Sequence, residues 1–180
     1  SWILIHTHPT ESQLARFELN RPWNFTEAGA IPKVSLTSFK ALVWYANARH
    51  WRNEKNITIL ILGGSGGTGT MGIQLARHFG ANEIITTTSA ANANYVTSLG
   101  ATRVIDYHSE NWFEILDDYS IDVIYDCVGL SGTANYAMRK IRKNGYFVTV
   151  AGELSKNTSR TATYHAFFTL IALRCFFFNL

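Results

Sequence analysis

A glycine-rich segment, Gly64-Ser65-Gly66-Gly67-Thr68-Gly69, is the part of the sequence with the clearest chemistry. It has the spacing G-x-G-x-x-G, follows a short apolar run and leads into a pattern typical of a helix. In a dinucleotide-binding loop of this kind, Gly64 would permit the tight turn, Gly66 would let the backbone approach a pyrophosphate, and Gly69 would let the helix pack closely on the strand. A helix N-terminus also attracts negative charge. The segment therefore predicts a pyrophosphate site, and the alternative is a glycine loop that binds no ligand.

The residues about 20 positions further on bear on which dinucleotide binds. An Asp or Glu there would accept hydrogen bonds from the ribose 2′-hydroxyl of NAD, but the sequence has Thr86-Thr87-Thr88-Ser89-Ala90. No carboxylate in this run would repel a 2′-phosphate, and the hydroxyls of Thr88 and Ser89 could donate hydrogen bonds to it. This favours NADP(H), although no Arg or Lys follows directly. The alternative is that these threonines only favour a strand.

Other side chains that could do chemistry lack the partners they would need. His6 and His8 could share a face of a strand, but no third ligand has an obvious spacing, so the sequence predicts no metal site. Ser65 lacks the G-x-S-x-G context of a hydrolase nucleophile. Cys127 and Cys175 lie far apart without a C-x-x-C pair, which suits a reducing, intracellular compartment.

The length and composition of the chain indicate how many domains it forms and which classes of partner it lacks the residues to bind. The chain has 180 residues, 47% of them apolar, which suits one domain of ordinary size with a small appendage. Its 16 Lys and Arg against 13 Asp and Glu are scattered, so the basic stripe of a nucleic-acid-binding protein is missing. The apolar run at 166–173 is far shorter than the roughly 18 residues that span a membrane. It is predicted to be a helix, followed by a buried strand at 176–180.

Strands and helices are predicted to alternate along the chain and to position the glycine-rich segment. Strands are expected at 57–62, 83–87, 102–106, 122–126 and 146–150, and helices at 68–79, 91–99, 110–117 and 133–140. This alternation predicts the α/β class, with a Rossmann-type doubly wound parallel sheet covered by helices on both faces. Ligands of such sheets bind at the carboxyl ends of the strands. The predicted rim consists of the loops at 63–68, 87–91, 106–109, 127–130 and 151–153.

The order of several short motifs resembles the medium-chain dehydrogenase/reductases, and most of all their zinc-independent quinone oxidoreductase branch, which includes the zeta-crystallin-like enzymes. The motifs that carry this resemblance are Ile61–Gly69, Gln74-Leu75-Ala76, Ser98-Leu99-Gly100-Ala101, Val104-Ile105-Asp106-Tyr107, Asp126-Cys127-Val128-Gly129 and Gly145-Tyr146-Phe147-Val148-Thr149, with Glu27–Pro32 and Leu36–Leu42 upstream. The resemblance implies an enzyme that transfers hydride from NADPH to a quinone or a conjugated carbonyl, without a catalytic metal. It assigns no catalytic acid or base here.

The resemblance also implies which residues bind the cofactor. The glycines and Thr68 would hold the pyrophosphate, Ser89 and Tyr107 would lie near the 2′-phosphate, and Thr37 would lie beside the nicotinamide. The full predicted set is Thr37, Gly64, Ser65, Gly66, Gly67, Thr68, Gly69, Thr88, Ser89, Tyr107, Cys127, Val128, Gly129, Ala151 and Gly152. Two departures stand out: Asn92 occupies the place of a phosphate-binding lysine in some members, which weakens the expectation of strict NADP selectivity, and Ser35 replaces a usual glycine.

Members of this branch carry a GroES-like substrate domain before the dinucleotide-binding domain. Residues 1–26 resemble only the end of such a domain, and residues 27–180 the Rossmann domain, so the chain looks truncated at both ends. An enoyl-thioester or alkenal reductase, and a non-catalytic nucleotide-binding scaffold or redox sensor, are the alternatives. The expected partner is a small molecule rather than nucleic acid or a membrane, and a homodimer stays open. The expected compartment is the cytoplasm, with the mitochondrion as the alternative.

Overall fold

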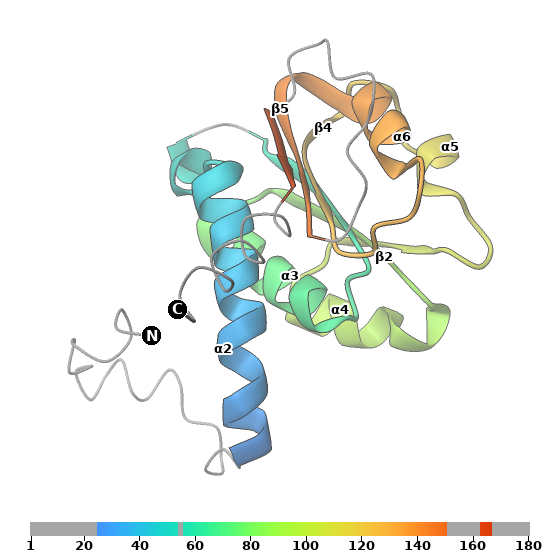
Figure 1. The fold of residues 1–180 in the computed structure, drawn as a ribbon. Helices are drawn as coiled ribbons and strands as arrows, with labels where there is room; N and C mark the ends of the chain where they lie inside the picture. The colour runs from blue at the N-terminus through green and yellow to red at the C-terminus, as the bar shows by residue number, and fades with distance from the viewer. Residues whose placement is uncertain (1–24, 54–55, 151–162, 167–180) are drawn as a thin grey trace.

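A parallel β-sheet forms the centre of the protein (Figure 1). The computed structural model describes residues 25–53, 56–150 and 163–166, and within them the sheet has six strands in the order β3-β2-β1-β4-β5-β6. The strands are β1 (Thr58–Leu62), β2 (Glu83–Thr88), β3 (Arg103–Asp106), β4 (Ile121–Asp126), β5 (Ile141–Thr149) and β6 (Thr163–Ala166). Every pairing is parallel, and the order reverses between β1 and β4. The predicted doubly wound Rossmann-type fold is confirmed.

Helices cover both faces of this sheet, as predicted. They are α2 (Phe25–Phe39), which continues into the π-helical turn η1 (Lys40–Tyr45), then η2 (Ala48–Asn53), α3 (Gly67–Phe79), η3 (Ala90–Asn92), α4 (Ala93–Leu99), α5 (Trp112–Ile115) and α6 (Thr133–Lys140). The prediction for α6 is correct at both ends, and α3 begins one residue earlier than expected. The helix expected at 110–117 is only the short α5.

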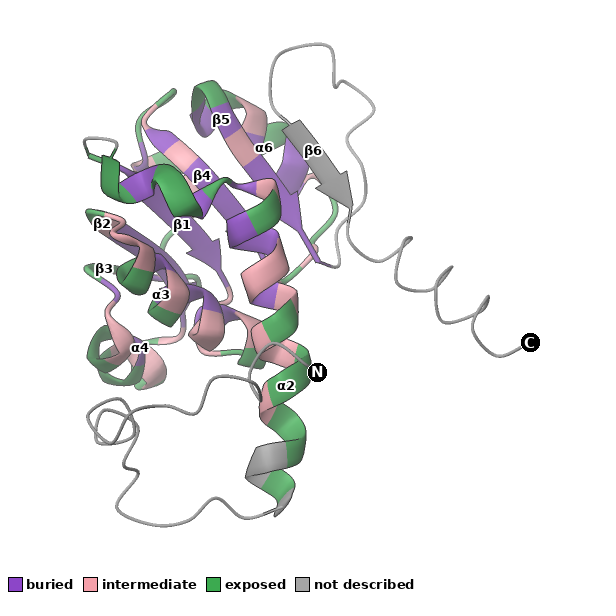
Figure 2. Cartoon of the chain, turned by 90° about the vertical axis from the view of Figure 1, so that its left-hand side faces the viewer, coloured by how far each residue is buried: buried purple, intermediate pink, exposed green. Residues whose placement is uncertain are grey.

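The burial of β1 shows why this strand is a continuous apolar run. Ile59 and Ile61 belong to the core on the side of α2, α3 and α4, whereas Leu60 and Leu62 belong to the core on the side of α5 and α6. All five residues of the strand are buried (Figure 2). A strand buried on both faces must be apolar at consecutive positions, which is the pattern of a central parallel strand.

Two strands differ from the sequence prediction. β5 begins at Ile141 rather than at 146, because the chain passes directly from α6 into the strand. Its residues 142–144 are polar and exposed, so they carried no apolar pattern. The sixth strand is Thr163–Ala166, whereas the strand predicted at 176–180 lies outside the described residues. The predicted domain boundary at 26/27 falls in the first turn of α2.

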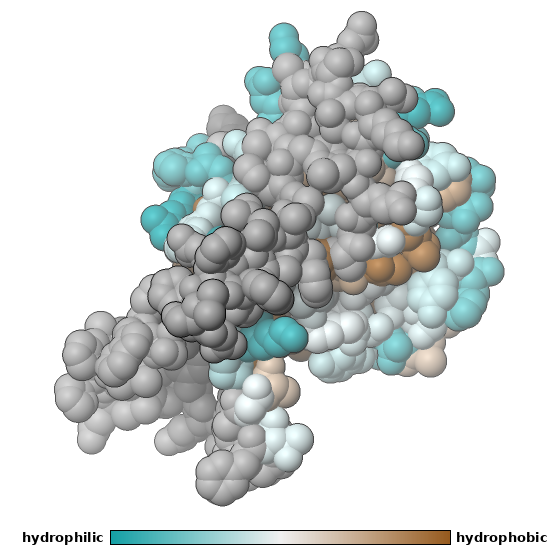
Figure 3. Space-filling view, viewed as in Figure 1, coloured by the Kyte–Doolittle hydropathy of each residue, from teal (hydrophilic) through white to brown (hydrophobic). Residues whose placement is uncertain are grey.

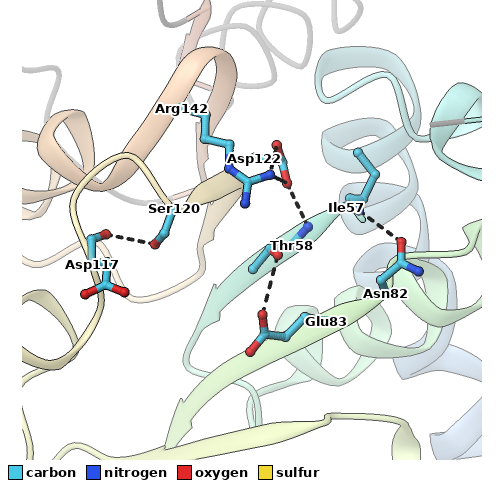
Figure 4. A network of polar contacts seen from close by, with 8 residues as sticks. All are labelled: Ile57, Thr58, Asn82, Glu83, Asp117, Ser120, Asp122 and Arg142. Atoms are coloured by element: carbon cyan, nitrogen blue, oxygen red, sulfur yellow. Dashed lines mark hydrogen bonds and ion pairs between the residues drawn. The ribbon is translucent and has the colours of Figure 1, made fainter. Parts of the chain in front are cut away.

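A polar network ties the amino ends of the central strands together (Figure 4). The Asp122 carboxylate on β4 accepts a hydrogen bond from the Thr58 N–H of β1 at 2.8 Å and pairs with Arg142 of β5 at 3.0 Å. The side chain of Asn82 accepts a hydrogen bond from the Ile57 N–H at 3.0 Å. These contacts fix the strand ends that lie opposite the predicted ligand rim. In the described part of the chain, no helix combines the length and apolar character that crossing a bilayer requires.

Candidate cofactor-binding site

The glycine-rich segment forms the tight turn between β1 and α3. The positive φ of this turn, +79°, belongs to Gly63, which the sequence analysis did not select. The role assigned to Gly64 is therefore corrected. A Cβ on Gly64 would lie 2.0 Å from the Thr86 hydroxyl oxygen, so Gly64 is needed because β2 approaches closely and not because of its own φ.

Gly69 and Gly66 have different surroundings. A Cβ on Gly69 would lie 2.1 Å from the Gly63 carbonyl oxygen and 2.8 Å from the Gly64 Cα, which matches the close packing expected of the third glycine. A Cβ on Gly66 would meet the Gly63 carbonyl oxygen at 3.4 Å, an ordinary contact, and Gly66 is exposed. The fold therefore requires a glycine at 69, whereas at 66 it would accept a Cβ.

The hydrogen bonds of the turn show which backbone donors are already used. The Gly63 and Gly64 N–H groups donate to the side-chain oxygen and the carbonyl of Thr87, both at 3.0 Å. The Gly66 N–H donates to the Gly63 carbonyl at 3.1 Å. The first N–H groups of a helix have no acceptor within it. Donors for an anion therefore come from the first turn of α3, which begins at Gly67.

Thr88 and Ser89, the two predicted hydroxyl donors at the end of β2, differ in their burial and in their hydrogen-bond partners. Thr88 is only 1% exposed, and its hydroxyl donates to the Ser65 side chain at 2.9 Å. Thr88 therefore supports the glycine-rich turn with its hydroxyl, and its role as a donor to a 2′-phosphate stays a prediction. Ser89 is half-buried at the rim, and its oxygen accepts a hydrogen bond from the Asn92 amide at 3.2 Å. The Ser89 proton is then available to an incoming acceptor.

The loop after β3 lies beside this position. Thr88 and Asp106 are paired in the sheet, and the Tyr107 N–H donates to the Thr88 carbonyl at 3.3 Å. The Tyr107 ring is exposed and contacts the His108 ring, with 4.3 Å between their centroids. Ser89 and Tyr107, which the sequence placed 18 positions apart, thus lie on neighbouring strand ends.

A buried polar cluster joins α2 to the ends of α3 and β4. The Ser38 hydroxyl donates to the Thr68 carbonyl at 2.8 Å and lies 3.2 Å from the Tyr125 hydroxyl oxygen. Because Ser38 has one proton, the Tyr125 hydroxyl is the donor in the second contact. The neighbouring Thr37, which was predicted to lie beside the nicotinamide, donates to the Lys33 carbonyl in its own helix at 2.9 Å. Sequence reasoning missed Ser38, since nothing in its local pattern distinguishes it.

The same cluster controls the ionisation of two side chains. Burial raises the pKa of the Cys127 thiol to about 12, although hydrogen bonds with Thr68 and Tyr125 oppose part of that rise. Burial also raises the pKa of the Tyr125 phenol far above its ordinary value, and the nearby Cys127 raises it further. Both groups therefore stay protonated at neutral pH. Cys127 does not have the lowered pKa of a nucleophilic cysteine.

The loop that follows β4 completes the described part of the rim. Val128 and Leu130 are 46% and 68% exposed, and the Gly129 N–H donates to the Asp126 carboxylate at 2.9 Å. The predicted contacts Ala151 and Gly152 lie outside the described residues. Among the residues that the structure describes, no group of three His, Cys, Asp or Glu side chains is placed to hold a metal ion.

Comparisons with known proteins agree with this geometry. The chain is 35% identical over 133 residues to 2-methylene-furan-3-one reductase from Solanum lycopersicum, covering 73% of this chain and 31% of the relative. It is 33% identical over 135 residues to the chloroplastic NADPH-dependent alkenal/one oxidoreductase from Arabidopsis thaliana, covering 73% of this chain and 32% of that protein. The chain therefore spans about a third of the length of these curated relatives.

A solved structure and a family profile extend the comparison. The structure of the quinone oxidoreductase from Coxiella burnetii superposes with a TM-score of 0.66 at 27% identity, covering 79% of this chain and 44% of that one. Residues 67–179 match the profile described as zinc-binding dehydrogenase. The chain therefore belongs to this dehydrogenase family and is a quinone-oxidoreductase-like member of the medium-chain dehydrogenase/reductase superfamily.

Proposed function

We propose that this chain is the cofactor-binding part of an NADPH-dependent oxidoreductase that transfers hydride to a conjugated carbonyl or a quinone. The observation that carries the proposal is the turn between β1 and α3, where Gly66 is exposed and a Cβ on it would make only an ordinary contact. The first turn of α3 supplies backbone N–H donors that have no acceptor within the helix. A helix N-terminus in this position favours a phosphate group. The site stands at the point where the strand order reverses, which is where doubly wound sheets bind nucleotides.

The residues at the end of β2 fit NADPH better than NADH. Ser89 has a donor proton to offer a 2′-phosphate, because its oxygen already accepts a hydrogen bond from Asn92. Residues 89–92 include no carboxylate that would repel the phosphate or hold a ribose 2′-hydroxyl. Asn92 takes part as a neutral side chain rather than as the cation seen at many phosphate sites. We therefore expect a preference for NADPH that is moderate rather than absolute.

The proposed binding residues divide into three groups. Ser65, Gly66, Gly67 and Thr68 would hold the pyrophosphate, and Ser89 with Tyr107 would lie near the 2′-phosphate. Cys127, Val128 and Gly129, with Thr37, Ala151 and Gly152, would line the nicotinamide side. Gly64 and Gly69 shape the turn without a contact of their own.

NADPH supplies the hydride when it is bound, so the task of this chain is to hold and orient the nicotinamide. The protonated Cys127 and Tyr125 and the aliphatic Val128 present no charge to that end of the site. The names of the tomato and Arabidopsis relatives favour a conjugated carbonyl as the acceptor, whereas the name of the Coxiella structure favours a quinone. An enoyl-thioester reductase and a nucleotide-binding scaffold without turnover remain the rival proposals.

Titration with NADPH and NADH tests the cofactor preference, and Ser89→Ala tests its cause. We expect NADPH to bind more tightly than NADH, and Ser89→Ala to weaken NADPH about tenfold, because a hydrogen bond to a charged group contributes about 1.5 kcal/mol. NADH affinity should change less than twofold. Binding is followed by quenching of tryptophan fluorescence and energy transfer to the nicotinamide.

Thr88→Val is the matched control for this titration. It removes a neighbouring hydroxyl that faces Ser65 rather than the ligand, so both affinities should fall by the same factor. Equal binding of NADPH and NADH by the unsubstituted chain would contradict the proposed preference. A chain that binds neither would contradict the proposed function.

The proposal extends to the compartment and the assembly of the protein. We propose the cytoplasm, with the mitochondrion as the alternative, and a small-molecule substrate as the partner, with a homodimer as the candidate assembly. Cell fractionation and sedimentation of the purified chain test these two points directly.

A further inference from the structure

The loop after β4 presents apolar side chains at the rim of the proposed site. Val128 and Leu130 are well exposed, and a Cβ on Gly63 would lie 2.8 Å from the Val128 Cγ2. The loop is thus in contact with the turn that precedes α3. Figure 3, drawn from the side of Figure 1, shows apolar surface in the region where Figure 1 places the loop between β4 and α6.

The carboxylate of Asp126 holds this loop in one conformation. Its Oδ1 accepts hydrogen bonds from the Val128 N–H at 3.0 Å and the Gly129 N–H at 2.9 Å. Its Oδ2 accepts a hydrogen bond from the Thr149 hydroxyl at 3.3 Å. Asp126 is only 1% exposed. Burying a carboxylate is costly unless its oxygens are hydrogen-bonded, so any other loop conformation would leave Oδ1 without its two backbone donors.

The backbone of Asp126 also links the loop after β4 to the ends of β1 and β5. It is the last residue of β4 and pairs with Leu62, the last residue of β1 before the glycine-rich turn. Its carbonyl accepts a hydrogen bond from the Val150 N–H at 3.0 Å, where β5 ends. One residue therefore sets the loop relative to the turn on one side and to β5 on the other.

We infer that Asp126 is a positioning residue for the nicotinamide half of the cofactor. It does not touch the dinucleotide. Its carboxylate fixes the backbone of Val128 and Gly129, so that the loop forms a firm apolar wall against which the nicotinamide and an apolar acceptor lie. This inference rests on the proposed function, and it adds a residue that the sequence analysis did not assign to the site.

The dissociation constants of two ligands distinguish a positioning role of Asp126 from a general effect of its replacement on the fold. NADPH spans both halves of the site, whereas adenosine 2′,5′-bisphosphate carries only the half that lies near Ser89. We expect Asp126→Ala to raise the dissociation constant of NADPH about tenfold, because the loop loses its two fixed N–H contacts. The dissociation constant of adenosine 2′,5′-bisphosphate should change less than twofold. Asp126→Asn keeps an oxygen for both N–H groups and should stay within about threefold of the unsubstituted chain.

Asp122→Ala provides the matched control on the same strand. Asp122 also accepts a backbone N–H and pairs with β5, but at the opposite end of the sheet (Figure 4). Its replacement should lower stability without changing the ratio of the two dissociation constants. If Asp126→Ala does not fold, Thr149→Val removes one contact of the carboxylate and should raise the NADPH constant about twofold to threefold.

The outcomes separate this inference from the proposed function. Equal weakening of both ligands by Asp126→Ala, or no weakening of NADPH in a folded variant, would overturn the positioning role and leave the proposed function standing. A failure of the unsubstituted chain to bind NADPH would overturn both.

Discussion

Replacing Gly69 with alanine is expected to lower the free energy of unfolding by about 3 kcal/mol, the upper part of the range for overpacked sites. The added Cβ would lie 2.1 Å from the Gly63 carbonyl oxygen and 2.8 Å from the Gly64 Cα. Both atoms belong to the backbone of a turn that β1 and β2 hold in place, so neither can rotate away. The loss is measured by urea unfolding, followed through tryptophan fluorescence, to which the buried Trp51 contributes.

Gly66→Ala is the control three residues away. Its Cβ would make only an ordinary contact, so the free energy of unfolding should stay within about 0.5 kcal/mol. NADPH affinity should nevertheless fall at least tenfold, roughly 1.4 kcal/mol, because the new methyl group would occupy the space where the backbone approaches the pyrophosphate. The same loss of stability in both variants, or unchanged binding by Gly66→Ala, would contradict this account of the turn.

The second large expected effect concerns the rate at which the Cys127 thiol is alkylated. The Cys127 thiol is expected to react with iodoacetamide at pH 8 roughly a thousandfold more slowly in the folded chain than in urea, because the reacting species is the thiolate. Burial raises the pKa of Cys127 from 9.0 to about 12, so the thiolate fraction falls by that order. Mass spectrometry of the peptide that contains Cys127 measures both rates on the same thiol. Comparable rates would show that the folded chain does not disfavour the Cys127 thiolate.

The same pKa shift predicts a loss of stability in alkali. The folded state holds the Cys127 and Tyr125 protons more tightly than the unfolded state, so their contribution is fully present below the unfolded thiol pKa of 9.0. It decreases as the pH rises from there toward 12. Unfolding by urea at pH 8 and at pH 10.5 measures this decrease, and Cys127→Ala should reduce it. Unfolding free energies that rise over this range would contradict the sign.

Much of the fold follows from local patterns in the sequence. The apolar run of β1, the glycines that end α3 and α4, and the basic last turn of α6 predicted most elements to within one or two residues. Alternating strands and helices then predicted the parallel sheet. The start of β5 was predicted at 146 instead of 141, because residues 142–144 are polar and exposed. Their strand conformation comes from pairing with β4 and not from their own pattern.

Some features of the candidate site also follow from the sequence, whereas others depend on the tertiary structure. The sequence by itself determined the dinucleotide-binding class of the turn, through the spacing of Gly64, Gly66 and Gly69, and the absence of a carboxylate after β2. Only the tertiary structure decided that Gly63 carries the positive φ and that Thr88 faces Ser65. Spacing along the chain reports local backbone geometry. The direction and the partners of a side chain depend instead on strand register and helix docking, which join residues far apart in sequence: Ser38 meets Tyr125 and Asp126 meets Thr149 only in the folded chain.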